Sequence, residues 1–446
     1  MNLSHLLKEQ MSVSRGCTEV GAISLATSLA YNSIRGYIPN WVFEKAKEKS
    51  ALKLPCVDKI EITLDRNVYK NAFSVGIPNT NGGSGIELMA ALGIYCEPEK
   101  KLELLGEINP EILARAKEIA SSGVVSVNVR DNWTGKSNLD VNVKIKSGKS
   151  EGACRIYGSH TNVVYVGNNH GTIYNREIEQ KEESHSSAEK IMKLKFSDLI
   201  EFVKEMGRED RDFILDGINR NDAAAKIGLE NQVGLGIGRN MQKLIDAGKL
   251  GGYAAYAQML TAAASDARMG GWNVPVSTSA GSGNQGIVVT NPIHAVHKLV
   301  KGDKDRLIES VALAHLVTIY SSAFSGYLSA LCGCTVKAGI GASAGMAYYF
   351  TKDAEIVSES VKHTAANIPG VICDGAKPGC SEKLCTAANT AVCSALLAES
   401  GVTVPCSNGI VAKTAEETIR NIGTISQGMI SLDKVIVEIM EEKQSL

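Results

Sequence analysis

Five of the 11 cysteines lie between residues 331 and 385, and their spacing is the strongest constraint on how this chain folds. Cys332 and Cys334 precede a run of small residues, while Cys373 and Cys380 enclose a turn that contains glycine and proline. A chain that folds back on itself in this way presents three thiolates to one point, which is typical of a soft-metal site. The sequence therefore predicts that these two cysteine segments meet.

The composition indicates a globular protein without a strong charge preference. Its 446 residues, 44% of them hydrophobic, suffice for two or three domains. With 47 basic and 48 acidic residues, the net charge of -1 attracts neither nucleic acid nor an anionic membrane. The amino terminus does not resemble a signal peptide, and there is no uninterrupted apolar run of about 18 residues. We expect a soluble, cytoplasmic protein with reduced cysteines.

Free cysteine is among the most buried residue types, so the cysteines outside the predicted site are expected to be packing residues. They are Cys56, Cys96, Cys154, Cys393 and Cys406.

Hydrophobic periodicity divides the chain into a strand-rich and a helical region. Residues 57–64 and 72–77 alternate as strands do, and four further strands are predicted before residue 170. Everything beyond residue 196 has a helical pattern, unusually rich in Ala, Gly and Ser. The predicted fold class is therefore α+β.

Three further stretches carry candidate functional groups. Cys17 stands at a predicted helix start, where unpaired N–H groups favour a thiolate, although a buried core cysteine is equally compatible. His160 lies in a polar pentad between two strands, as a catalytic or a plain loop residue. The loop 279–286 offers N–H groups, hydroxyls and amides for a carboxylate or phosphate, with a tight turn as the alternative.

Six motifs together resemble those of the L-cysteine desulfidase family, which is similar to the α part of iron-sulfur L-serine dehydratases. In chain order they are Gly16-Cys17-Thr18-Glu19, Pro78-Asn79-Thr80, His160-Thr161-Asn162, Gly281-Ser282-Gly283-Asn284-Gln285-Gly286, Cys332-Gly333-Cys334-Thr335 and Cys373-Asp374-Gly375-Ala376-Lys377. The resemblance spans nearly the whole chain, and six ordered motifs are far more specific than any one of them.

This resemblance implies a lyase, independent of pyridoxal phosphate, that splits L-cysteine into hydrogen sulfide, ammonia and pyruvate through aminoacrylate. It implies an oxygen-sensitive 4Fe-4S cluster that takes part in β-elimination without net electron transfer. The alternative is an iron-sulfur L-serine dehydratase that gives pyruvate and ammonia. The seven-residue spacing of Cys373 and Cys380 is shorter than in the dehydratases and favours the desulfidase.

Carried over by position, Cys334, Cys373 and Cys380 match the three cluster ligands of the family. Cys332 competes with Cys334 for the first position, and Cys385 is expected to pack in a helix. Cys17 matches the amino-terminal family cysteine, with two roles left open: the fourth ligand, or the base that removes the substrate's Cα proton.

The same comparison suggests how an amino-acid substrate is held. His160 is the second candidate for the base. The residues expected to bind the substrate carboxylate are Ser282, Asn284 and Gln285, with Asn79, Thr80 and Thr161 contributed by the α+β region.

For Cys17 to reach Cys334, residues 1–50 must pack with residues 190–446 in one helical, cluster-binding domain. Residues 55–185 then form an inserted α+β domain. L-cysteine is the expected partner, with no nucleic acid and no membrane, and the sequence leaves open whether the protein is a homodimer. A pyridoxal-phosphate lyase and a non-catalytic cluster-binding protein are the remaining alternatives.

Overall fold

The computed structural model describes residues 2–44, 57–130, 139–176 and 190–444. Its elements, in chain order, are α1 (Leu3–Gln10), β1 (Val13–Arg15), α2 (Thr18–Ser33), β2 (Lys59–Leu64), α3 (Arg66–Ala72), α4 (Ile86–Gly93), η1 (Pro98–Glu107), α5 (Pro110–Ser121), β3 (Val125–Val129), β4 (Asp140–Ser147), β5 (Ser150–Tyr157), β6 (Val163–Asn168), β7 (Gly171–Asn175), α7 (Phe196–Glu205), α8 (Arg208–Glu230), α9 (Ile237–Asp246), α10 (Gly252–Met269), β8 (Pro275–Ser277), α11 (Gly283–Val300), α12 (Lys304–Ser325), η2 (Gly333–Lys337), α13 (Ala338–Thr351), α14 (Ala354–Asn367), α15 (Cys380–Glu399), α16 (Ala415–Gly428) and α17 (Ile430–Gln444).

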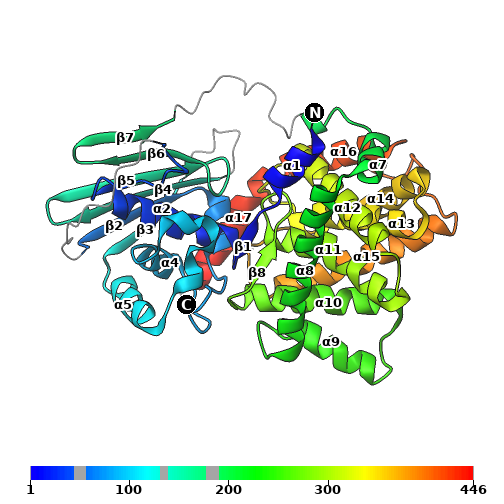
Figure 1. Cartoon of the computed structure of the whole chain (residues 1–446), viewed down its shortest axis with the longest axis horizontal. Coiled ribbons are helices and arrows are strands. Elements are labelled where there is room, and N and C mark those ends of the chain that lie inside the picture. Colours follow the sequence, from blue (N-terminus) through cyan, green and yellow to red (C-terminus); the bar gives the residue numbers. More distant parts are fainter. Residues whose placement is uncertain (1, 45–56, 131–138, 177–189, 445–446) are drawn as a thin grey trace.

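A six-stranded sheet occupies one side of the molecule, with the strand order β3-β2-β4-β5-β6-β7 (Figure 1). Neighbouring strands are antiparallel except for β2 and β3, which are parallel. Alternate residues of β4, including Val141, Val143 and Ile145, are buried, as the period-two pattern predicts. Together with the many helices, this mixed sheet confirms the α+β fold class.

One predicted strand, residues 72–77, is wrong. The chain instead forms helix α3 over Arg66–Ala72 and continues without a strand. The Asp65 carboxylate accepts hydrogen bonds from the backbone N–H groups of Asn67 and Val68. This side-chain cap starts a helix, and the alternation of residues 72–77 does not reflect its geometry.

Helix α2 packs on β4, β5 and β6, so it belongs to what we call the sheet part, the elements from α2 to β7. A Cβ atom at Gly152 of β5 would lie 2.0 Å from the backbone oxygen of Ala30, so only glycine permits this close approach. The assignment of residues 1–50 to the helical domain stays a prediction. Helix α1 packs on α12, and β1 pairs with β8.

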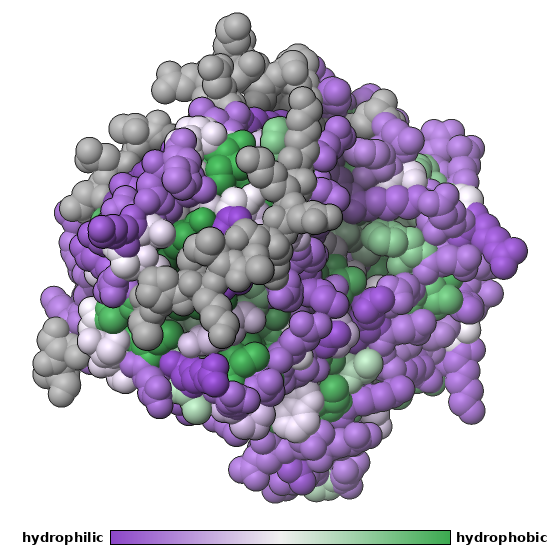
Figure 2. Space-filling view, turned by 60° about the vertical axis from the view of Figure 1, so that its left-hand side comes forward, coloured by the Kyte–Doolittle hydropathy of each residue, from purple (hydrophilic) through white to green (hydrophobic). Residues whose placement is uncertain are grey.

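The helical part, the elements from α7 to α16, is built around α12 and α13 (Figure 1). By length and composition α12 is apolar enough to cross a membrane, but 89% of its apolar stretch is buried, as in the core helix of a soluble protein. On the face drawn in Figure 2 hydrophobic residues form small groups among hydrophilic ones.

Helix α17 lies between the two parts (Figure 1). The ammonium group of Lys70, in α3, is 2.5 Å from the carboxylate of Asp433, in α17, and both side chains are buried. The division of the chain into domains at residues 50 and 190 stays a prediction, because the proposed boundaries border residues 45–56 and 177–189, outside the described residues.

Candidate functional site

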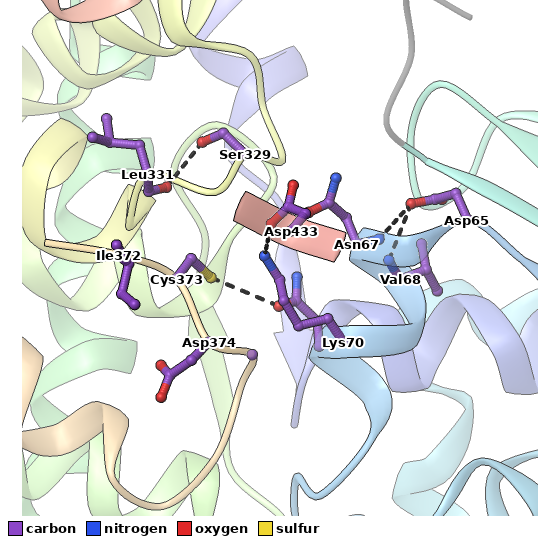
Figure 3. A network of polar contacts seen from close by, with 12 residues as sticks. Asp65, Asn67, Val68, Lys70, Ser329, Leu331, Ile372, Cys373, Asp374 and Asp433 are labelled. Atoms are coloured by element: carbon purple, nitrogen blue, oxygen red, sulfur yellow. Dashed lines mark hydrogen bonds and ion pairs between the residues drawn. The ribbon is translucent and has the colours of Figure 1, made fainter. Parts of the chain in front are cut away.

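Backbone hydrogen bonds bring the two cysteine segments together. Cys332 donates its N–H to the oxygen of Val371 at 2.9 Å, and Cys373 donates to the oxygen of Ala330 at 2.7 Å. Between them Leu331 and Ile372 form a β-bridge, and Figure 3 shows these two residues on neighbouring segments beside Cys373. The backbones of Cys332 and Cys373 therefore lie side by side, although 40 residues lie between them in the sequence.

Four thiols influence one another at this junction: those of Cys332, Cys334, Cys373 and Cys380. Cys332 precedes the one-turn helix η2, and Cys380 is the first residue of α15. The hydrogen bond with Cys334 lowers the pKa of Cys332 to about 5, while the same bond and burial raise that of Cys334. Of the two thiols, that of Cys332 therefore loses its proton first.

Positive charges surround these thiols. Lys337 is completely buried and donates to the backbone oxygens of Gly326 and Tyr327 at 2.5 and 3.1 Å. Burial lowers the pKa of Lys337 to about 8, although the negative charges of the nearby cysteines favour its protonated form. Lys70 also lies within reach of their charge. Burying a cation is costly without an anion close by, so this arrangement suits cysteines that are ionised together.

The donor set fits an iron-sulfur cluster better than a single ion. Within the residues that the structure describes, no three His, Cys, Asp or Glu side chains meet in a way that suits one metal ion. The ligands of a cubane cluster bind different iron atoms and therefore stand farther apart than those of one ion. Several cysteines with buried cations beside them match such a cluster in chemistry and, once they are ionised as ligands, in charge.

Cys17 caps the start of α2 and is buried, but the structure does not favour its thiolate. Its Sγ donates a hydrogen bond to Oε2 of Glu19 at 2.8 Å. Burial and the negative charge of Glu19 raise the pKa of Cys17 well above its ordinary value. The expectation from the helix terminus was incomplete, because it did not include a carboxylate two residues away.

Glu19 is the centre of a buried network. Besides Cys17, it accepts hydrogen bonds from the Thr18 hydroxyl at 3.0 Å and the Asn71 amide at 2.9 Å, and Nε2 of His160 lies 3.6 Å from its Oε1. Burial alone would raise the pKa of Glu19, but the His160 ring and the Cys17 hydrogen bond hold it well below its usual range. The carboxylate is therefore ionised inside the protein.

Asn71 connects this network to the cysteine segments. Its amide nitrogen donates to Glu19, and its oxygen lies 3.9 Å from Sγ of Cys373. Cys17 and Cys373 are thus joined through two side chains, those of Glu19 and Asn71. A chain of contacts through Glu19 and Asn71 therefore links Cys17 to the predicted cluster site.

The loop 279–286 lies between the Glu19 network and the cysteine segments. His160 lies against this loop, since a Cβ at Gly281 would be 3.7 Å from its Nδ1. On the other side, a Cβ at Gly333, between Cys332 and Cys334, would be 3.0 Å from Nε2 of Gln285. Gln285 is buried and its Oε1 has no hydrogen-bond partner among the described residues. Ser282 is half-buried and caps α11.

Asn79 and Thr80 are engaged in their own turn. The Asn79 amide donates to the backbone oxygens of Leu105 and Gly106, and the hydroxyl of the buried Thr80 donates to the oxygen of Ile77. This turn packs against the residue before Cys17, because a Cβ at Gly16 would be 2.6 Å from Cγ of Pro78. These hydrogen bonds give the two residues a role in positioning Cys17. Thr161 is half-buried next to His160.

The remaining cysteines divide into two groups. Cys385 packs against the sulfur of Met241 at 3.6 Å, as expected, and Cys96 and Cys154 are buried. Cys393 and Cys406 are exposed, so the expectation that they are core residues is wrong. Both stand outside the packed interior, Cys393 on α15 and Cys406 after it. Cys56 lies outside the described residues.

Sequence reasoning missed four residues of the site: Glu19, Asn71, Arg268 and Lys337. The sequence could have identified Glu19, because it stands two positions after Cys17 in the same motif. Asn71 and Arg268 lie in helices with no motif, and only the fold brings them to Cys373 and Asn284. Lys337 follows Cys334 by three positions, and a lysine there gives no sign that it is buried.

Comparisons with known proteins identify the family of this chain. The family model of the serine dehydratase alpha chain matches residues 99–438. The chain is 35% identical over 448 residues to a UPF0597 protein of Desulfatibacillum aliphaticivorans, with 98% of each chain covered. It is 36% identical over 443 residues to a UPF0597 protein of Alkaliphilus oremlandii, with 99% of this chain and 98% of the relative covered. The resemblance to serine dehydratase alpha chains is therefore confirmed.

The substitution Glu19→Gln tests the buried network. We expect it to destabilise the protein by about 2–4 kcal/mol, because a neutral amide replaces a carboxylate that accepts several hydrogen bonds. Urea unfolding followed by circular dichroism measures the change. The control is Glu111→Gln, at a position 74% exposed and paired with Arg115, where we expect little effect. Equal midpoints for the two variants would contradict the role of Glu19.

Proposed function

Because the chain belongs to the serine dehydratase alpha chain family, whose members are iron-sulfur lyases, we propose that it is an L-cysteine desulfidase. In this proposal it converts L-cysteine to hydrogen sulfide, ammonia and pyruvate without pyridoxal phosphate. The observation that carries the proposal is the junction of the cysteine segments with Cys17 and Glu19 through Asn71. It gathers soft ligands, a proton acceptor and a polar loop at one place.

We assign Cys334, Cys373 and Cys380 as ligands of a 4Fe-4S cluster. Cys332 stays the alternative to Cys334: it is buried and accepts a hydrogen bond from the Thr335 hydroxyl at 3.3 Å, which favours its thiolate, whereas Cys334 is half-buried. When bound by three cysteines, such a cluster supplies an iron with an open position, a Lewis acid for the substrate sulfur. Lys70 and Lys337 contribute positive charge beside these ligands.

The residues around Glu19 provide the proton acceptor for β-elimination. Cys17 is the first candidate for the base, a role that requires its thiolate: the positive charge of Arg268 favours that form, whereas burial and the carboxylate of Glu19 oppose it. His160 is the second candidate, because its ring faces the same carboxylate. The electron pair of the Cα–H bond then forms the Cα=Cβ double bond as the Cβ–S bond breaks. Aminoacrylate is released and hydrolyses through its imine to pyruvate and ammonia.

The loop 279–286, between His160 and the cysteine segments, binds the substrate in this proposal. Ser282 and Gln285 have polar groups available there, and Thr161 follows His160 in the chain. Asn79 and Thr80 were predicted to bind the substrate carboxylate themselves. We propose that they act through Cys17 instead, because their hydrogen bonds stabilise the turn that packs against the residue before it. Asn284 is oriented by a hydrogen bond from Arg268 at 2.9 Å.

An L-serine dehydratase is the second candidate, favoured by the name of the matching family model. Both reactions remove a Cα proton and a β-substituent and end in pyruvate and ammonia. The two differ in the leaving atom, for which a thiophilic iron site prefers sulfur. A cytoplasmic location and sensitivity to oxygen belong to the same proposal, because exposed clusters and reduced thiols persist under reducing conditions.

Anaerobic reconstitution with iron and sulfide, followed by parallel assays, tests the function. We expect visible cluster absorbance, and faster sulfide release from L-cysteine than pyruvate release from L-serine. Faster turnover of serine would favour the second candidate. Sensitivity to borohydride in the purified protein would instead indicate a pyridoxal-phosphate enzyme. A cluster without turnover of either amino acid would contradict both lyase proposals.

Replacement of Cys373 tests the ligand assignment. We expect Cys373→Ala to lose both the visible absorbance and the lyase activity, because the cluster loses one of three protein ligands. The matched control is Cys393→Ala, at an exposed cysteine on α15, which we expect to keep both. Full iron content and normal activity in Cys373→Ala would refute the assignment.

Replacement of Cys17 separates its two roles. We expect Cys17→Ala to keep iron and absorbance but to lose turnover by about 100-fold or more, as when a general base is removed. The reason is that the Cys17 sulfur is engaged with Glu19. Loss of the cluster in this variant would show that Cys17 is the fourth ligand instead.

A further inference from the structure

We propose that Arg268 is the residue that binds the α-carboxylate of the substrate. Arg268 lies near the end of α10, and no sequence motif marks it. The inference rests on the proposed function for the identity of the substrate, an amino acid. It adds the positive charge that the polar loop 279–286 does not itself contain.

Arg268 is a buried cation that forms no ion pair with any of the described residues. Its side chain is only 2% exposed. Its hydrogen bonds among the described residues go from Nη1 to Oδ1 of Asn284 at 2.9 Å and, more weakly, to the sulfur of Met269 at 3.9 Å. The buried Nε has no hydrogen-bond partner in the part of the chain that the structure describes. A guanidinium in this state costs free energy unless an anion joins it, and a carboxylate matches its planar pair of donors.

The loop 279–286 packs directly on the Arg268 side chain. A Cβ at Gly283 would lie 2.4 Å from Nε, so glycine lets the guanidinium contact the backbone of the loop directly. Asn284, the next residue, holds Nη1 in place. The first turn of α11 and the guanidinium thus form one rigid unit whose free donors are Nε and the N–H groups at the helix start.

This unit stands beside the groups assigned to proton removal. The charge of Arg268 acts on the Cys17 thiol, and Gly281 of the same loop contacts His160. A carboxylate bound to Arg268 therefore places the adjoining Cα near the proposed bases. Neutralising that carboxylate also stabilises the negative charge that develops when the Cα proton leaves.

A second explanation is that Arg268 only offsets the negative charge of the cysteine segments. Three lysines already offset the negative charge of the cysteine segments. Lys70 and Lys337 interact with the charges of Cys332 and Cys373, and Lys383 with the same two cysteines. Arg268 instead acts on Cys17. The position of Arg268 therefore favours a role in substrate binding over a role in balancing the charge of the cluster.

The test compares substrates with and without a carboxylate in the reconstituted, full-length protein. The variants are Arg268→Met and Arg268→Lys, with Arg208→Met as a control because Arg208 is 94% exposed. We expect Arg268→Met to lose about 100-fold or more of kcat/KM with L-cysteine, mainly through KM, since charge-assisted hydrogen bonds are removed. With L-cysteinamide, which carries no carboxylate, we expect a change of less than about 3-fold. Arg268→Lys should lie between, and the control should match the wild type.

Binding of L-alanine gives a readout that does not need turnover, because L-alanine has the carboxylate but no leaving group. We expect L-alanine to raise the Tm of the wild type and of Arg208→Met but not that of Arg268→Met. Without ligand, Arg268→Met should melt no earlier than the wild type, because the substitution removes an unpaired buried charge. If Arg268→Met does not fold, the same comparisons with Arg268→Lys decide.

Two results would overturn the inference: equal losses with L-cysteine and L-cysteinamide, or an unchanged Tm response to L-alanine in Arg268→Met. The first would assign Arg268 to the charge balance of the cluster. If the wild type turns over neither cysteine nor serine, the proposed function fails by itself. An Arg268-dependent response to L-alanine would then still support a carboxylate site, and its absence would refute one.

Discussion

The ionised Glu19 carboxylate must stay buried, and the fold around the site is organised to satisfy it. Its partners come from the start of α2, from α3 and from the loop after β5. A buried carboxylate without such partners would be strongly unfavourable, so these three segments are held in one arrangement. Because α2 packs on the sheet and β1 pairs with β8, the network lies where the chain crosses between the two parts.

Charge explains how the rest of the site is arranged. The cysteine segments are backed by the buried Lys70 and Lys337, and Asp433 of α17 pairs with Lys70 from the other side. Figure 3 shows this pair next to Cys373 and Asp374, so the carboxyl-terminal helix supports the same junction. Arg268 differs from Lys70, because it is buried and forms no ion pair among the described residues. Under our proposal the substrate completes this charge arrangement.

Local signals predicted most of the elements but not their partners. Alternation identified β2 and β4, and it was wrong for residues 72–77, where the capping side chain of Asp65 decides for a helix. The turn between Cys373 and Cys380 predicted a compact cysteine segment, and the β-bridge of Leu331 with Ile372 shows how it meets Cys332. Burial was misjudged for Cys393 and Cys406, since residue type alone reveals neither which face of α15 is covered nor that Cys406 lies in a turn after that helix.

The sequence by itself determined the α+β class, the family of the chain, and the cysteines and polar loop that form the candidate site. Spacing and motif order suffice for these, because they depend on neighbours along the chain. Only the tertiary structure decided that α2 lies on the sheet, that Cys17 faces Glu19, and that Arg268 stands unpaired beside Asn284. Burial and electrostatics depend on groups brought together from distant segments, and no local pattern records them.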